Sequence, residues 1–200
     1  MSTVFDNTNY TVGMAYVFIH DTTSTTGLKA LDAQVASEYA DDYGSTNYCV
    51  GNTMAVEIAP DITYLDHFIS INGERRRDKS ISTTKSISVN FTFDEINSTN
   101  IKRFLYGETA VAASPTFIVN ASPTKEVSAQ IVFNTSVGND FIYKIPYAVL
   151  KTDGSLSFDP EDWMNANMVL DVLYDSEYTH NGTAAPYGYV DFSATSKYVD

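Results

Sequence analysis

Hydrophobic and polar side chains alternate most regularly over residues 84–94. This period of two predicts a β-strand with one buried and one solvated face, because successive side chains of a strand point to opposite sides. The apolar positions are Ile87, Val89, Phe91 and Phe93. The polar positions, which we expect to be solvated, are Ser86, Ser88, Asn90, Thr92 and Asp94.

The pattern changes to a helical one directly afterwards, over residues 99–106. Apolar residues separated by three and four positions predict a short amphipathic helix that packs on the sheet. Ser98 or Thr99 is expected to cap its beginning, and Gly107 suits its end. The side chains expected to pack on the sheet are Ile101, Phe104 and Leu105.

Runs of β-branched and aromatic residues between turn residues predict the other strands. Proline lacks the amide that a sheet needs, so Pro60 predicts a bend and Pro146 predicts a bend or an edge position. Together these elements predict a mainly β protein, a single-domain β-sandwich or barrel with one short α-helix. The strand ranges are 10–20, 53–59, 62–71, 115–120, 126–134, 141–150 and 167–175.

Two long segments do not fit the strand pattern. Residues 21–53 are polar, small and acidic, with a candidate helix at 28–39, and residues 176–200 read as an extended tail. A connection as long as 21–53 is usually functional, although a plain surface excursion explains the composition equally well. No repeat or linker divides the chain, so residues 1–200 are predicted to form one domain.

The charge of the chain narrows its partners. The 200 residues include 25 acidic and 12 basic ones, which gives a formal net charge of -13. Clamping nucleic acid requires clustered cations, so this acidity argues against a nucleic-acid-binding protein. The chain shows neither a membrane-spanning stretch nor a signal peptide, so we expect no membrane association.

The charge is also uneven along the chain. Residues 74–79 carry four of the 12 basic residues, whereas residues 152–200 carry nine acidic residues against the single basic Lys197. Glu74 and Asp78 interrupt the arginine cluster, which favours contact with an acidic surface on another copy over nucleic-acid binding. Two different patches that attract each other suit head-to-tail association. The candidate contact residues are Arg75, Arg76, Arg77, Lys79, Asp159, Glu161 and Asp162.

Candidate chemistry is sparse. Cys49 is the lone cysteine, and His20, His67 and His180 lie far apart, so no metal site is predicted. The carboxylates of residues 159–162 lack the spacing of a calcium loop and read as a solvated loop. No phosphate-binding glycine loop or nucleophile motif occurs, so no cofactor is expected and the chain is not predicted to be an enzyme. A dispersed pair of carboxylates is the remaining enzymatic alternative.

Several short motifs follow one another in order over residues 56–108. A Gly-Glu-Arg-Arg stretch at 73–76 precedes Asp78-Lys79, the alternating strand ends at Asp94-Glu95, and a short helix closes with Gly107. This order resembles that of the major tail tube proteins of long-tailed, siphophage-like bacteriophages. Three later segments continue the resemblance: residues 144–158, 168–175 and 186–189.

The resemblance implies a tail-tube type of β-sandwich or barrel whose copies form stacked, hexameric rings around a hollow channel. The solvated face at residues 86–94 would then line the lumen, through which DNA passes without specific binding. Residues 21–53 and the C-terminal extension would reach neighbouring copies. The implied partners are further copies of the chain and the tape-measure, tail-terminator and tail-tip proteins. The implied location is the virion tail, assembled in the host bacterial cytoplasm.

A carbohydrate-binding β-sandwich is the alternative from another class. It would explain the 14 Tyr and 11 Phe residues as part of a ligand face. The single Trp and the missing secretion signal argue against it.

Overall fold

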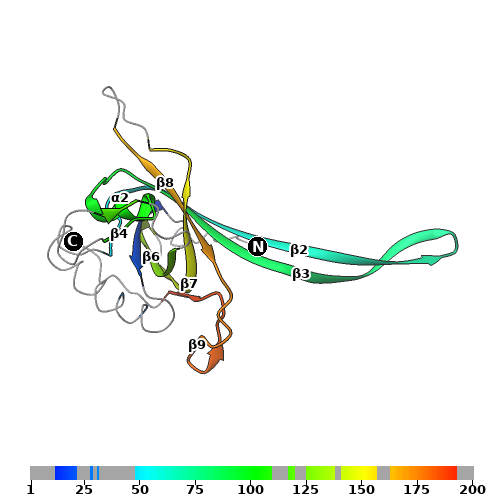
Figure 1. Ribbon diagram of the computed structural model, residues 1–200. Coiled ribbons are helices and arrows are strands. Elements are labelled where there is room, and N and C mark those ends of the chain that lie inside the picture. Colours follow the sequence, from blue (N-terminus) through cyan, green and yellow to red (C-terminus); the bar gives the residue numbers. More distant parts are fainter. Residues whose placement is uncertain are drawn as a thin grey trace.

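The computed structural model confirms the mainly β fold predicted from the sequence (Figure 1). The structure describes residues 12–21, 28, 31, 48–109, 117–119, 125–137, 141–156 and 163–192. Its main sheet has seven antiparallel strands. Their order is β1 (Val12–His20), β6 (Lys125–Val137), β7 (Phe141–Asp153), β8 (Ala166–Val172), β3 (Glu74–Phe93) and β2 (Thr53–Ile71), with β11 (Tyr189–Asp191) also beside β7.

Two small two-stranded sheets accompany the main sheet. Strand β4 (Glu108–Thr109) pairs with β5 (Phe117–Ile118), and β9 (Thr179–His180) pairs with β10 (Thr183–Ala184). The predicted strand at residues 115–120 is therefore present only as the short β5 within the part of it that the structure describes.

The main sheet curls back on itself, as the barrel-like prediction requires. Its outermost strands are β1 and β2, and residues 48–50 just before β2 are bonded to β1. The Ile19 amide donates to the Tyr48 carbonyl at 2.8 Å, and the Val50 amide donates to the Val17 carbonyl at 3.0 Å. These bonds bring the two outer strands together.

The main core lies on one side of the sheet, which we call the core face. Val89, Phe91 and Phe93 of β3 are buried there, and Phe104 of the helix packs into the same cluster. This burial confirms the alternation predicted for β3. Buried side chains from the other strands complete the cluster: Val17, Ile19, Val127, Ala129, Ile131, Tyr143, Ile145, Ala148, Leu150, Ala166, Met168, Leu170 and Val172.

A second apolar cluster covers the opposite side of the sheet at its β1–β6–β7 end. Leu28 and Leu31, from the 21–53 excursion, are buried there against Phe18 of β1 and Tyr178 of the C-terminal segment. Residues 28 and 31 are helical, and the rest of the candidate helix at 28–39 lies outside the described residues. The excursion therefore supplies core side chains.

The predicted short helix is present as α2 (Ser98–Phe104). Its N-cap differs from the prediction: Asn97 caps it, because the Asn97 side chain accepts the Asn100 amide at 2.9 Å. Asparagine caps a helix as well as serine does. At the other end the helix stops at Phe104 with Leu105 as its C-cap, and Tyr106 adopts the left-handed conformation with a φ of +51°. The expected Gly107 lies one residue further on, where its amide donates to the Lys102 carbonyl at 2.8 Å.

The two prolines act differently. The bend expected at Pro60 is wrong, because β2 continues through it as one 19-residue strand. Strand β2 lies at the edge of the sheet, where a missing amide leaves no partner unsatisfied. Pro146 agrees with its prediction: the pairing of β6 with β7 is irregular between Val127 and Ala129, opposite Pro146.

Half of the β2–β3 hairpin leaves the body of the molecule (Figure 1). Strand β8 pairs with β3 only over Ile87–Phe93, so beyond Ile87 the hairpin consists of β2 and β3 alone. We call residues 62–85 the arm. The predicted strand at 84–94 is thus the last part of the 20-residue β3, which begins at Glu74.

The C-terminal segment folds back onto the sheet as far as residue 192. After β8 the chain forms the β9–β10 hairpin and returns to add β11 to β7, with Tyr189 opposite Lys144. The segment expected as an extended tail therefore contributes a strand over this part of its length.

Candidate assembly surfaces

The five predicted lumen residues lie on the side of β3 away from the core face. Ser86 is exposed, and Ser88, Asn90, Thr92 and Asp94 are half-buried. Asp94 lies just beyond the strand and accepts a hydrogen bond from the Asn52 side-chain amide at 2.7 Å. The structure thus brings these residues together in one polar row.

Neighbouring strands widen this row into a surface, because residues directly opposite each other in an antiparallel pair share a face. On β2, Glu57 lies opposite Asn90 and Asp61 lies opposite Ser86. On β8, Asp171 lies opposite Ser88, and Asn167 lies opposite Thr92, whose hydroxyl donates to the Asn167 side-chain carbonyl at 2.8 Å. We call this surface of β7, β8, β3 and β2 the polar face.

The polar face is acidic as well as polar. Strand β7 adds Lys151, which lies opposite Val169, and Asp153, which lies opposite Asn167. The Lys151 ammonium forms an ion pair with Asp171, so its charge is compensated within the face. Glu57, Asp61 and Asp153 are exposed. The described part of this face therefore presents an excess of negative charge.

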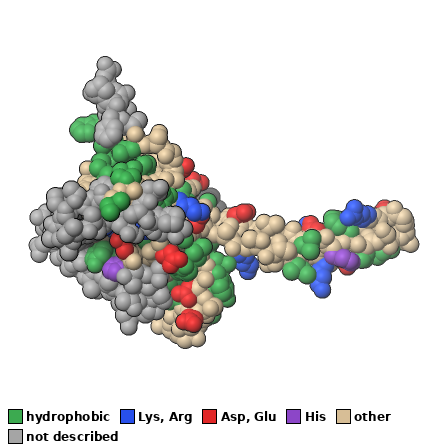
Figure 2. Space-filling model, viewed as in Figure 1, with side chains coloured by type: hydrophobic (Ala, Val, Ile, Leu, Met, Phe, Trp, Pro, Cys, Tyr) green, Lys and Arg blue, Asp and Glu red, His purple; other side chains and the backbone are tan. Residues whose placement is uncertain are grey.

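The predicted arginine cluster lies at the free end of the arm, where it is divided between two sides (Figure 2). Arg75 and Arg77 lie opposite Ser70 and Phe68 of β2, on one side of the ribbon. Arg76 and Lys79 lie opposite Ile69 and His67, on the other side. Ordinary strand alternation separates Arg76 from Arg75 and Arg77. The register shift at Asp78 places Lys79 on the side of Arg76, because an extra residue on one strand reverses the direction of the side chains that follow.

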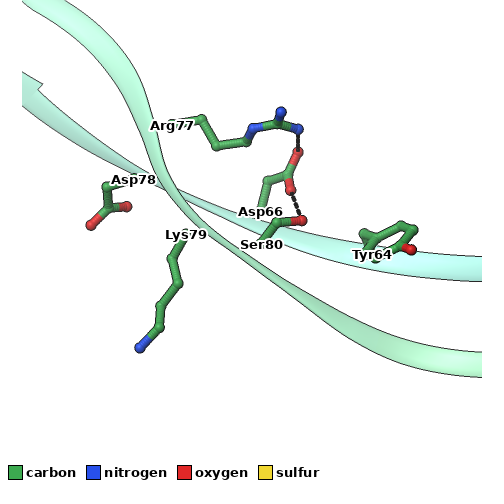
Figure 3. A pocket seen from close by; sticks show the side chains of 6 residues that line it. All are labelled: Tyr64, Asp66, Arg77, Asp78, Lys79 and Ser80. Atoms are coloured by element: carbon green, nitrogen blue, oxygen red, sulfur yellow. Dashed lines mark hydrogen bonds and ion pairs between the residues drawn. The ribbon is translucent and has the colours of Figure 1, made fainter.

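Contacts within the arm orient its charged side chains. The Arg77 guanidinium donates to Asp66 at 3.1 Å, and the Ser80 hydroxyl donates to the other Asp66 oxygen at 2.6 Å (Figure 3). These two bonds, with the serine contributing most, lower the pKa of the Asp66 carboxyl. Figure 3 also shows Lys79 pointing away from this group, from the other side of the ribbon.

Two further arginines are held by neighbours. Arg76 donates two hydrogen bonds to the Glu74 carboxylate, at 2.6 and 3.0 Å. The Arg75 guanidinium lies 4.3 Å from the centroid of the Phe68 ring, which is a cation–π contact. The three arginines of the arm are thus each held by a neighbouring side chain. Of the side chains that line the pocket in Figure 3, Asp66, Arg77 and Ser80 bond to one another.

Large apolar side chains on the arm were missed as a surface by the sequence pattern. Leu65 is 66% exposed and lies opposite Ile81, which is 55% exposed. No other strand or layer covers such residues on a two-stranded ribbon. Their exposure could be predicted only from how far the hairpin extends beyond the neighbouring strands. The exposed set is Ile62, Tyr64, Leu65, Phe68, Ile71 and Ile81.

The acidic half of the predicted inter-subunit contact cannot be described in the same way. Asp159, Glu161 and Asp162 lie outside the described residues. The structure therefore places the basic half, Arg75 to Lys79, and leaves the proposed pairing with residues 159–162 a prediction.

Two buried polar residues of α2 were also missed by the sequence reading. The Arg103 guanidinium donates to the Ile19 carbonyl at 2.9 Å, and the Asn100 side chain donates to the Val50 carbonyl at 2.8 Å. Burial lowers the pKa of Arg103, against the opposing effects of Asp21 and Cys49. Together the two side chains fasten both ends of the 21–53 excursion to the helix. Their sequence spacing looks like that of ordinary exposed helix residues.

The described part of the chain contains no group of three or more His, Cys, Asp or Glu side chains that could hold a metal ion. None of its helices has the length and hydropathy needed to cross a membrane.

Comparison with known proteins places the sequence in a family. A search of curated proteins found no match. The profile of the family described as protein of unknown function UCP028589 matches residues 34–136, which are 103 of the 200 residues. The match includes the whole arm, β3 and α2. The chain therefore belongs to the UCP028589 family.

Proposed function

We propose that this protein is a structural subunit that assembles with copies of itself into stacked rings, forming the hollow tail tube of a long-tailed bacteriophage. The observation that carries the proposal is the arm: a projecting ribbon with a basic end and six exposed large apolar side chains, attached to an acidic body. The hexameric symmetry and the phage context rest on the sequence resemblance.

Burial of its exposed apolar side chains would favour binding of the arm to another surface. An isolated two-stranded hairpin is only marginally stable in water. Fully burying one large aliphatic or aromatic side chain contributes about 1.5–3 kcal/mol, so docking the arm on a surface would be strongly favourable. Leu65 and Ile81 lie on one side of the ribbon and Tyr64 and Phe68 on the other, so both sides of the arm offer apolar surface to a partner.

The opposite net charges of the arm and the body favour a second copy of the chain as the partner of the arm. The arm carries five basic residues and three acidic ones, for a net charge of +2, so the other 176 residues carry -13 - 2 = -15. A basic projection and an acidic body attract each other between copies. Because arm and body are different surfaces, the contact is head-to-tail and propagates into rings or tubes.

The polar face supplies a surface suited to a channel. Its exposed carboxylates would repel the phosphates of DNA, its small polar groups carry no positive charge, and its Lys151 is neutralised by Asp171. DNA would then pass along the face without binding. Tape-measure, tail-terminator and tail-tip proteins would be the partners of such a tube, and the virion tail would be its location.

Carbohydrate binding, the alternative considered from the sequence, gains less support. It needs aromatic side chains grouped on one platform. Among the described residues, the most exposed aromatic rings are dispersed: Trp163 and Tyr174 lie near opposite ends of β8, Phe192 follows β11, and Tyr64 lies on the arm. No catalytic role is proposed.

Electron microscopy and sedimentation velocity of the purified protein test the proposal. We expect rings or tubes that appear above a threshold concentration. Arg76→Glu at the end of the arm should raise that threshold about tenfold or more, since it replaces an attraction by a repulsion. Lys102→Glu makes the same change of charge on α2 and serves as the control, which should leave the threshold nearly unchanged. A parent protein that stays monomeric at high concentration would refute the proposal.

A further inference from the structure

The direction in which the arm leaves the body depends on a narrow region. Strand β8 supports β3 only as far as Ile87, which lies opposite Val172, and the arm continues from there with two strands. Pairing between β2 and β3 keeps the ribbon together but does not fix its angle to the sheet. A fixed angle between the arm and the sheet therefore requires a contact between the base of the arm and the body.

Tyr187 lies at this base. Its hydroxyl donates to the carbonyl of Lys85, the last residue of the arm, at 3.2 Å. The two residues are 102 positions apart in the sequence. This bond joins the C-terminal segment to the arm just beyond Ile87, where the pairing of β3 with β8 ends.

The body holds Tyr187 firmly. The hydroxyl of the buried Tyr143, on β7, donates to the Tyr187 carbonyl at 2.9 Å. The Tyr187 ring packs against the main core and meets the Tyr174 ring edge-on, with centroids 5.6 Å apart. Because the Tyr187 backbone and ring are both held by the body, its hydroxyl can hold the Lys85 carbonyl at a fixed place relative to the body.

The adjacent Gly188 shows how closely this segment is fitted to β7. Gly188 has a φ of +89°, and a Cβ atom there would lie 2.0 Å from the Lys144 carbonyl oxygen. Only glycine can bring the chain this close at that φ. The close approach lies beside Pro146, between the stretches of β7 that pair with β11 and β8. Tyr187 is thus anchored in the sheet itself.

The length of the arm turns a small angle into a large displacement. Ten residues of β2 at about 3.3 Å each make an arm of about 33 Å. A change of about 10° at the base would move the tip by about 6 Å. Specific docking needs atoms to meet within far smaller errors, so an arm without a fixed direction would dock poorly.

We propose that Tyr187 is an arm-positioning residue: its hydroxyl, bonded to the Lys85 carbonyl, sets the direction of the arm relative to the sheet. The effect of Tyr187 on assembly rests on the proposed function, in which an arm of fixed direction reaches its site on a second copy. The partner is that second copy, and Tyr187 acts on it only through the arm.

Distances between spin labels on the dilute monomer test the proposal. Labels are attached to Ser70→Cys on the arm and Asp153→Cys on β7, both exposed positions, in a Cys49→Ser background. Tyr187→Phe keeps the ring and removes the hydroxyl. We expect its distance distribution to shift or broaden by about 5 Å relative to the parent, as the lever predicts. Tyr174→Phe, a neighbouring tyrosine that is 61% exposed, is the control and should match the parent.

The thermal midpoint and the assembly threshold of the same variants separate the possible outcomes. Tyr187→Phe should keep a thermal midpoint close to that of the parent while its assembly threshold rises severalfold. A Tyr187→Phe distribution that overlaps the parent's overturns the positioning role, whatever happens to assembly. If the parent itself never assembles, the proposed function fails, while the distances still decide the role of Tyr187.

Discussion

The two halves of β3 show how one strand can serve two purposes. From Ile87 to Phe93 it lies between β2 and β8, and its apolar side chains are buried on the core face. From Glu74 to Lys85 it pairs with β2 alone, and its side chains are exposed throughout. Equally apolar residues, such as Phe91 and Ile81, therefore stabilise the fold in one half and remain available for binding in the other.

Burial in this protein follows the number of neighbouring strands. The half within the body has a third strand and a core beneath it. The arm has neither, and it is organised by cross-strand contacts such as those of Asp66 with Arg77 and Ser80. Exposed contacts of this kind stabilise a ribbon only slightly. We infer that the body holds nearly all of the folding free energy.

Truncating one apolar side chain in each half should give the largest contrast. Phe91→Ala removes a ring that is 2% exposed and should lower the free energy of unfolding by about 3–5 kcal/mol. Ile81→Ala removes an exposed side chain and should change it by less than about 0.5 kcal/mol. Urea unfolding measures both. Equal losses would show that the arm is part of the cooperative core.

Glycines in the two regions provide the next contrast. Gly188→Ala combines a positive φ with a clash against the Lys144 backbone, and should cost about 3 kcal/mol in unfolding free energy. Gly73 in the turn of the arm has a φ of +81° but open space around it. Gly73→Ala should therefore cost only about 1 kcal/mol, from the backbone strain alone. The prediction fails if thermal unfolding ranks the two variants in the opposite order.

At alkaline pH, a tyrosine of the body should affect the free energy of unfolding more than a tyrosine of the arm, and per pH unit this difference should be the smallest of the three. Burial raises the pKa of Tyr143 to about 12, from 10.0 in the unfolded chain. The unfolded chain loses this proton first, so the contribution of Tyr143 is complete below pH 10 and is lost as the pH rises towards 12. The loss is about 1.4 kcal/mol per pH unit, or about 2.7 kcal/mol in all.

Tyr143→Phe tests this dependence. The variant should lack that part of the decline in unfolding free energy between pH 10 and pH 12, when urea unfolding is followed across the range. Tyr64→Phe, on the arm, is the matched control and should keep the full decline. If Tyr143→Phe declines as steeply as the parent, the buried tyrosine is not the source of the pH dependence.

The sequence predicted the body better than the arm. Alternation at residues 87–93 and the spacing in α2 reflect burial, so the strand, the helix and the core positions could be read from them. Pro60 misled the strand prediction, because a proline at a sheet edge and a proline at a bend look alike in sequence. The strand at 62–71 was predicted, but residues 74–79 were interpreted only as a charge cluster, so the pairing of 62–71 with 74–85 was missed. The lack of a third strand depends on where β8 ends.

The candidate surfaces were predictable only in part. The clustering of Arg75, Arg76 and Arg77 was visible, whereas the side on which Lys79 lies depends on the register shift at Asp78. The polar row from Ser86 to Thr92 followed from alternation, but Glu57 and Asp171 join it only through strand pairing. Tyr187 could not be found, since its bond to Lys85 spans 102 positions.

Pro60 has a consequence for the protein before any partner is bound. Strand β2 has an outer edge without a partner strand in the described sheet, and such an edge invites indiscriminate strand addition and precipitation. A proline near its middle removes one donor from that edge, and the acidic Glu57, Asp61 and Asp66 of the same strand disfavour close approach of an identical edge. The proline and these carboxylates therefore disfavour the pairing of this edge with the same edge of another chain.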